Sequence, residues 1–470
     1  MAQVVRVPEG VLPAPRDGDL PAPSPLRAML GPGIILAGLS IGSGEFVLWP
    51  RLTAEWGFAV FWAAWIGVTI QFFLNMEIER YTLATGESAV TGFLRLSRVF
   101  GPIFLICGTL PWIWPGWATG AATMLVWEIG GSASLYTVIG LVLCGLVLSL
   151  GPVVYRTLEL LQIGLVALIF TSLTVLAALV VRPDAIARLF EGALRIGYVP
   201  DGIELPLLLG ALAFAGAGGT VNLAQSNYIK DKGYGMGRWI GRITSPFTGK
   251  EEAVGEVGVR FGSSPANLER WQVWWRRANI EHFFSFYVLC IVSLALLCLL
   301  TYSLLEPGAP VAEGFGFIQA QSHALGARFG PFARHIFLLA GIAVLFSTEL
   351  ALLDAVTRVL ADILHVGWRR ASSWSLSRLY MAILWGMIAF GIGVVALGLN
   401  QPLLLLVLSA SLNAFVMFLY SGLLLWLNLR SFRGPVRPHP VRCLALVGSL
   451  GFFGYFSGLT LWAQMSRLAS

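Results

Sequence analysis

The stretch Met29-LGPGIILAGLSIGSGEFVLWP-Arg51 has a later counterpart, Leu205-PLLLGALAFAGAGGTVNLAQSNYI-Lys230. Each is long enough to cross a bilayer, which takes about 20 apolar residues. Each also has a small and polar centre, Gly42-Ser43-Gly44-Glu45 in the first and Gly216-Ala217-Gly218-Gly219-Thr220 in the second. Unwound backbone at that depth is tolerated only against protein or a water-filled cavity. Paired interruptions of this kind indicate the binding site of a secondary transporter, and we predict the substrate site there.

The composition places the rest of the chain in the membrane as well. Of the 470 residues, 57% are hydrophobic and only 12% are charged, against about 25% charged in soluble domains. The lipid bilayer is therefore an expected partner, and nucleic acid is not, because the net charge of +6 belongs to loops that set topology. The five cysteines show no metal-ligand spacing, so we expect buried thiols and no cofactor.

Hydropathy predicts eleven membrane spans. They lie near 29–50, 58–79, 101–127, 135–152, 158–181, 205–229, 280–303, 333–360, 380–398, 402–427 and 443–465. Most of the 31 Lys and Arg fall on one side of this arrangement. The positive-inside rule then puts the N-terminus in the cytoplasm and the C-terminus outside, in a plasma membrane of bacterial type.

The eleven spans divide into two sets of five and one extra. Residues 29–181 and 205–427 then have opposite topology, and each set begins with an interrupted span, as in transporters built from inverted repeats. Residues 443–465 form the eleventh span, and residues 1–28 are expected to be a disordered cytoplasmic tail. The loop 230–278 is expected in the cytoplasm, with a helix from Ser264 lying on the membrane surface.

No signature of an enzyme is present in the sequence. The nucleotide-binding pattern G-x-x-x-x-G-K-[ST] does not occur, and the five histidines form no metal-ligand pair. We therefore expect neither catalysis nor direct use of ATP.

The first span resembles the opening helix of the Nramp divalent-metal transporters. Gly31-Pro32-Gly33, an interval of eight residues and Gly42-Ser43-Gly44-Glu45-Phe46 are similar to the family's Gly-Pro-Gly and Asp-Pro-Gly-Asn-Phe. The likeness extends over most of residues 29–465 and implies an all-α membrane protein with the leucine-transporter fold and broken helices 1 and 6. It also implies transport of a divalent metal ion by alternating access.

The chain departs from that family at the residues expected to hold the metal. Gly42 stands where the family has its metal-binding Asp, and Glu45 stands where it has Asn. In the sixth span, Gly219, Thr220 and Val221 stand where the family has Met, Pro and His, with Asn222 retained. The soft thioether ligand that favours transition metals is therefore missing.

Glu45 is the predicted metal ligand, because a carboxylate at membrane depth usually marks an ion or substrate path. The alternative is a helix cap stabilised by the helix dipole. The other predicted binding residues offer neutral oxygens or backbone carbonyls, which suit a hard divalent cation. They are Ser40, Gly42, Ser43, Gly216, Gly219, Thr220 and Asn222.

The glycine-rich break also allows the opposite interpretation. Free backbone N–H groups at a half-helix N-terminus attract anions. The carboxylate of an organic solute would bind there, with Glu45 facing its amine. An ion-coupled carrier of an amino acid or amine is thus the alternative to a divalent-cation transporter, with H⁺ or Na⁺ as the coupling ion in either case.

Further charges in apolar spans are candidates for coupling or gating. Glu77 and Arg80 share one helical face, and Asp354 and Arg358 are four residues apart, so each pair can form. For each of these two pairs, the sequence is consistent with a gate and with a structural ion pair. Glu349 has no helical partner in the sequence and is a second candidate for proton coupling.

Overall fold

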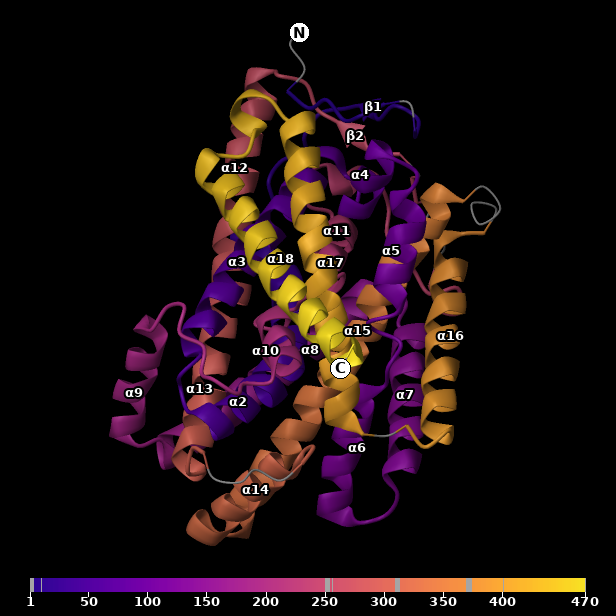
Figure 1. Cartoon of the computed structure of the whole chain (residues 1–470). Helices are drawn as coiled ribbons and strands as arrows, with labels where there is room; N and C mark the ends of the chain where they lie inside the picture. The colour runs from indigo at the N-terminus through magenta and orange to yellow at the C-terminus, as the bar shows by residue number, and fades with distance from the viewer. Residues whose placement is uncertain are drawn as a thin grey trace.

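The protein is an elongated bundle of helices in the computed structural model (Figure 1). The structure describes residues 4–9, 11–249, 254–255, 257–308, 313–368, 374–399 and 401–469. The N-terminal segment lies at one end of the bundle, which we call the tail end, at the top of Figure 1. Helix α14 (Gly316–Phe329) lies at the opposite end.

Nine helices of the described part are long and apolar enough to cross a membrane. Each corresponds to one predicted span, and the chain is accordingly an integral membrane protein. They are Pro32–Trp56, α3 (Phe61–Thr85), α7 (Ala133–Leu150), α8 (Val154–Val180), Pro265–Leu304, α15 (Pro331–Gly367), α16 (Leu376–Ala396), α17 (Pro402–Ser431) and α18 (Pro440–Ala469, of which Pro440–Trp462 qualifies).

Two predicted spans are each divided into two shorter helices. The span at 205–229 consists of α10 (Leu205–Ala213) and α11 (Val221–Lys232), with an irregular segment between them. The span at 101–127 consists of α5 (Phe100–Thr109) and α6 (Gly116–Ile129). The second division was not predicted. Pro111 and Pro115 lie within it, and proline cannot donate the backbone hydrogen bond that a helix interior needs.

The first span is not unwound as expected. It consists of α1 (Pro32–Ser40), a π-helical segment η2 (Ile41–Leu48) and α2 (Trp49–Trp56), and the three run on as one helix. Gly42 and Gly44 are not among the positive-φ glycines. The small residues here widen the helix instead of ending it, and π segments of this kind are common at functional sites.

The prediction that the helix after Ser264 lies on the membrane surface is wrong. Helix α12 (Pro265–His282) continues through a π segment, η4 (Phe283–Val288), into α13 (Leu289–Leu304). Trp271 and Trp274 are buried, so the aromatic residues pack inside the protein and do not anchor it to lipid. The tryptophan–arginine pattern fits both environments, and packing against the N-terminal segment decides between them.

The N-terminal segment is ordered, and the prediction of a disordered tail over residues 1–28 is wrong for its described part. Strand β1 (Arg16–Asp17) pairs in parallel with β2 (Val259–Arg260), with Arg16 opposite Val259. Val5 and Leu20 are fully buried. The hydrogen bond from Arg260 to Asp17, 2.8 Å, holds the pKa of Arg260 above its ordinary value. The buried side chains of Val5 and Leu20, together with the strand pair, order a segment whose composition alone suggested disorder.

The remaining elements are short. They are η1 (Leu26–Ala28), α4 (Ala89–Leu96), α9 (Pro183–Leu194), η3 (Gly235–Trp239) and η6 (Gly434–Val436). In Figure 1, α4 lies at the tail end and α9 near the opposite end.

Candidate substrate site

The irregular segment between α10 and α11 runs from Phe214 to Thr220. Gly216, Gly218 and Gly219 have φ values of 144°, 76° and 55°, a region that only glycine enters without strain. A right-handed helix cannot pass through these angles, so the chain leaves the helix where the sequence predicted the break. The backbone groups released here need partners, because they are buried.

Gln71, at the middle of α3, supplies partners on both sides of the break. Its amide nitrogen donates to the carbonyl of Ala213 at 2.8 Å. Its amide oxygen accepts from the backbone N–H of Gly218 at 3.0 Å and from Asn222 Nδ2 at 3.3 Å. One side chain thus joins the end of α10, the irregular segment and the start of α11. Sequence reasoning missed Gln71, although an amide at the centre of an apolar span was a visible signal.

The predicted glycines also allow close backbone approach. A Cβ at Gly44 would lie 1.9 Å from the carbonyl oxygen of Phe214, so η2 touches the break through this residue. A Cβ at Gly42 would lie 1.9 Å from Thr348 Oγ1 on α15. Gly42 therefore serves close packing, in addition to any role of its carbonyl.

Glu45 is fully buried on η2, but its carboxylate points to α13. It accepts hydrogen bonds from Ser40 Oγ and Ser293 Oγ. Ser40 was a predicted member of the site, and Ser293 was missed. Neither hydroxyl belongs to the break. In this conformation the backbone next to Glu45 touches the irregular segment at Phe214, but the carboxylate is hydrogen-bonded elsewhere.

Thr220 contacts an aromatic cluster that includes two tryptophans of the divided span α5–α6. Trp112 Nε1 donates to Thr220 Oγ1 at 2.8 Å. The Trp112 ring stacks on Phe214, with centroids 5.5 Å apart, and on Trp117, at 5.6 Å. The interruption of α5–α6 thus closes against the interruption of α10–α11, a contact that hydropathy cannot reveal.

Asn222 begins α11 and links the site to α17. Its Nδ2 donates to the hydroxyl of Tyr420 at 3.0 Å, while its Oδ1 has no hydrogen-bond partner within the described part of the chain. Asn413 Oδ1 is likewise without a described partner, and a Cβ at Gly219 would lie 1.7 Å from it. The break therefore offers neutral amide, hydroxyl and carbonyl oxygens, which are hard ligands.

Glu349 is a residue of α15, and its carboxylate lies at the start of α6. Its Oε2 accepts from the backbone N–H of Ala118 at 3.2 Å, and the side chain is buried. A carboxylate at this position satisfies an orphan N–H and interacts favourably with the helix dipole. The side chain of Ser43, another predicted site residue, lies outside the described part of the structure.

A buried ionic network joins α11 to α15 toward the tail end. Arg358 contacts Asp354 at 2.7 Å and also pairs with Asp231. Tyr380 donates to Asp354 at 2.6 Å. Lys230 contacts Asp362 at 3.1 Å. The predicted pair of Asp354 and Arg358 is therefore part of a larger cluster, whose member Asp231 was missed.

Glu77 and Arg80 form a two-bond ion pair, at 2.8 and 2.9 Å. Arg80 also donates to the carbonyl of Val436 at 2.9 Å, and its guanidinium lies 4.0 Å from the ring centre of Trp275. Asn428 Nδ2 donates to the Glu77 carboxylate at 3.0 Å. This cluster ties α3 to α12, α17 and the segment before α18, away from the break.

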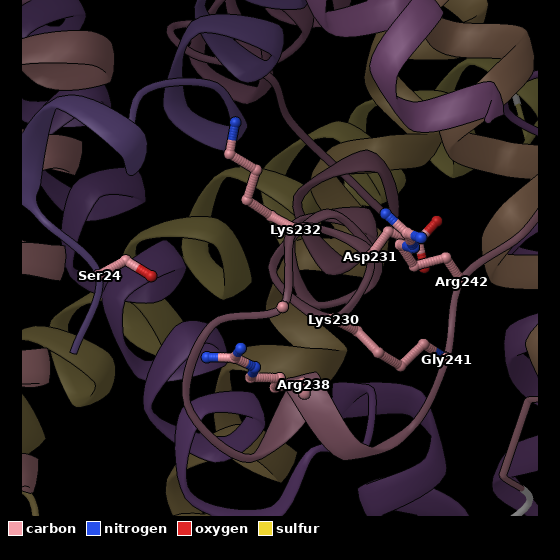
Figure 2. Close-up of a pocket in the computed structure, with 9 residues that line it drawn as sticks. Ser24, Lys230, Asp231, Lys232, Arg238, Gly241 and Arg242 are labelled. Atoms are coloured by element: carbon pink, nitrogen blue, oxygen red, sulfur yellow. The ribbon is translucent and has the colours of Figure 1, made fainter. Parts of the chain in front are cut away.

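A cavity of about 520 Å³ opens where α11 ends. Figure 2 shows its residues on the end of the helix and on the loop that follows, with Ser24 of the N-terminal segment opposite. Its lining is Ser24, Lys230, Asp231, Lys232, Gly233, Gly237, Arg238, Gly241 and Arg242. Because Lys230 and Asp231 also belong to the ionic network, this cavity adjoins the contacts that join α11 to α15.

Solved structures of other proteins share this fold. A manganese transporter of Eremococcus coleocola, in a histidine-to-alanine mutant form, matches with a TM-score of 0.70 and 16% sequence identity. The match covers 96% of this chain and 91% of that one. The same transporter in complex with an aromatic bis-isothiourea substituted compound matches equally, again at TM-score 0.70.

A second kind of transporter matches less closely. Mhp1, a nucleobase-cation-symport-1 family transporter in a closed conformation, has a TM-score of 0.51 and 13% identity, over 92% of this chain and 93% of that one. No family model matches the chain, and no curated protein matches its sequence. The structural likenesses show the leucine-transporter fold expected from the sequence. The break between α10 and α11 is seen in this structure itself.

Proposed function

We propose that this integral membrane protein is a secondary transporter that moves a hard divalent metal cation by alternating access. The observation that carries the proposal is the match of almost the whole chain to a manganese transporter, at a TM-score of 0.70. The chemistry of the break supports it independently, because the buried groups there are oxygen donors of the kind that Mg²⁺, Mn²⁺ and Ca²⁺ prefer.

The cation would bind between η2 and the irregular segment. Asn222 Oδ1 and Thr220 Oγ1 supply neutral oxygens, and the carbonyls of the break supply more. Glu45 supplies the negative charge, and reaching the ion requires it to leave Ser40 and Ser293. The π segment offers a route, because closing a π turn into an α turn rotates the residues that follow it.

Access from the tail end would be controlled by the ionic network. Arg358 holds Asp231 and Asp354 together, and Lys230 holds Asp362, so α11 cannot separate from α15 while these pairs persist. Breaking a buried pair leaves an uncompensated charge. We therefore propose that the pairs reform within a different arrangement when the site opens. The tail end is assigned to the cytoplasm by the positive-inside rule.

The test is uptake of Mn²⁺ into liposomes that contain the purified protein, with Mg²⁺ and Ca²⁺ as competitors. Saturable uptake is expected in the unaltered protein, and Glu45→Gln is expected to abolish it. Glu128→Gln is the matched control, since Glu128 pairs with the partly exposed His335 at 2.8 Å on the outer part of α6. Calorimetric titration with the same ions measures binding separately from transport.

Each negative result has a distinct meaning. Absence of both uptake and binding for all three cations would overturn the proposed substrate class. Uptake unchanged by Glu45→Gln would overturn the role of Glu45 alone. The organic-solute alternative has weaker support, because Mhp1 matches less well than the manganese transporter. Uptake of an amino acid or amine without any cation uptake would favour it.

A further inference from the structure

A strip of buried polar side chains runs between α3 and α11. Gln71, Asn75 and Glu79 are spaced four residues apart and therefore lie on one face of α3. Asn222 and Gln225 lie opposite on α11: Asn222 Nδ2 is 3.3 Å from Gln71 Oε1, and Gln225 Nε2 is 3.1 Å from Glu79 Oε2. All five side chains are fully buried. The strip begins at the irregular segment and runs toward the tail end.

The strip ends at α12. Gln225 Nε2 lies 3.4 Å from His282 Nδ1, and the His282 ring stacks on Phe286 with centroids 4.8 Å apart. Glu281, next to His282, accepts from Ser285 Oγ at 2.9 Å. These groups extend the series of buried polar side chains from the break toward the tail end.

Many atoms along this strip lack partners. Within the described part of the chain, no hydrogen-bond partner exists for Asn75 Oδ1 and Nδ2, Glu79 Oε1, Asn222 Oδ1, Gln225 Oε1 and His282 Nε2. Buried polar groups in native proteins are almost always paired with protein or with ordered water. A row of such atoms along one interface is the arrangement that a file of bound water satisfies.

We propose that this strip is a water-filled proton path, and that Glu79 is the carboxyl group that binds the coupling proton. The inference rests on the proposed function, since it names the ion that drives that transport. The step is a simple transfer. Hydronium gives a proton to the Glu79 carboxylate and becomes water, and the carboxyl group later returns the proton to water on the other side.

The surroundings of Glu79 suit a group that changes charge. Glu281 of α12 and Arg442 of α18 act on it with opposite signs. His282 and the phenol of Tyr234, from the loop after α11, are the other titratable groups that face this region. Within the residues that the structure describes, Glu79 Oε2 accepts its hydrogen bond from the neutral amide of Gln225, whereas Glu77 on the same helix is paired with Arg80. Glu79 is therefore the carboxyl of α3 that can be neutral without breaking an ion pair.

The strip lies on a different side of α11 from the ionic network. Nine residues separate Asn222 from Asp231, and at about 100° per residue they lie on opposite faces of the helix. Proton movement along α3 and movement of the cation past α15 would thus use two sides of one half-helix. This arrangement lets α11 couple them without a shared ligand.

The experiment measures proton entry and Mn²⁺ uptake in the same liposomes, with a pH-sensitive dye inside. In the unaltered protein, an inward Mn²⁺ gradient should carry protons with it. Glu79→Gln should remove the proton signal and the pH dependence of uptake, while Mn²⁺ still moves down its own gradient. Asn75→Leu, which places an apolar side chain in the strip, should reduce the proton signal in the same way. Glu128→Gln should change neither.

Proton entry per Mn²⁺ that is unchanged in both strip variants would overturn the proposal. A second measurement is independent of transport: infrared difference spectra between acidic and alkaline samples should contain a protonated-carboxyl band that Glu79→Gln removes and Glu128→Gln retains. An identical band in Glu79→Gln also overturns it. If the unaltered protein takes up no Mn²⁺, the proposed function fails, and the infrared band still decides whether Glu79 binds a proton.

Discussion

The two glycine-rich interruptions look alike in sequence but differ in structure. In the first, Gly42 and Gly44 lie in a continuous helix that widens to a π turn. In the second, Gly216, Gly218 and Gly219 take positive φ values, and the helix ends. The difference teaches that a glycine in an apolar span serves either of two needs. It admits a neighbouring backbone, or it allows a conformation that other residues avoid.

The two interruptions also differ in how their polar groups are satisfied. The π segment remains helical, and its one carboxyl side chain is hydrogen-bonded by two hydroxyls. The broken segment gives up backbone bonds, and Gln71 replaces them from another helix. The first interruption is therefore self-contained, whereas the second depends on a single distant amide. Four substitutions test this contrast.

The largest effect is expected for Gln71→Leu. It leaves the carbonyl of Ala213 and the N–H of Gly218 buried without a partner, at roughly 1–3 kcal/mol each. The thermal midpoint in detergent should fall strongly, and transport should be lost. Gln321→Leu is the matched control, because among the described residues that buried amide bonds to Thr301, at 3.0 Å, and to no broken helix. Equal shifts in the two variants would contradict the special role of Gln71.

Gly219→Ala should come next. It places a Cβ 1.7 Å from Asn413 Oδ1 at a residue with φ of 55°. Left-handed backbone costs roughly 1–2 kcal/mol for a residue with a side chain, and overpacking typically adds about 1–3 kcal/mol. Gly422→Ala on α17 is the control, since its nearest neighbour would be 3.4 Å away. Thermal unfolding of both variants measures the difference.

Ser293→Ala probes the π segment. It removes one of the two hydroxyls that bond to Glu45, and leaving a buried acceptor without a partner costs roughly 1–3 kcal/mol. We expect a moderate loss of stability with the fold intact. Ser421→Ala, which removes a bond of 2.8 Å between two neutral hydroxyls, should cost less. A stability order opposite to this one would argue against an ionised or strongly bonded Glu45.

The smallest effect is expected for Trp112→Phe. The ring stack with Phe214 and Trp117 persists, and only the hydrogen bond to Thr220 is lost, at about 0.5–1.5 kcal/mol. Trp112→Ala should lower the free energy of unfolding several times more, because it removes the stacked ring as well. If the two variants unfold at the same temperature, the hydrogen bond and not the stack closes the break.

The sequence predicted the architecture well, because long apolar spans and charge asymmetry are strong signals. It predicted the break in the sixth helix to the residue range, where three of the glycines do take positive φ. It did not predict that the first helix stays continuous, because the close contacts of Gly42 with Thr348 and of Gly44 with Phe214 come from other helices and are not visible in the sequence.

The site was predicted only in part, because contacts between distant helices are again not visible in the sequence. Gln71, Trp112, Ser293 and Asp231 contact site residues from distant parts of the chain, and their roles depend on which helices become neighbours. Three of the four are polar or charged residues within or beside an apolar span, so they could have been nominated. Their partners could not, because helix adjacency is a tertiary property.

The N-terminal segment is held mainly through its backbone. Arg270 donates to the carbonyl of Leu20 at 2.7 Å, and Trp274 donates to that of Pro21 at 2.9 Å. Arg95 donates to the carbonyl of Pro13 at 2.9 Å. Every residue carries a carbonyl, so these three contacts do not depend on the side chains at positions 13, 20 and 21. The course of the segment is set instead by the side chains that donate to these carbonyls, those of Arg95, Arg270 and Trp274.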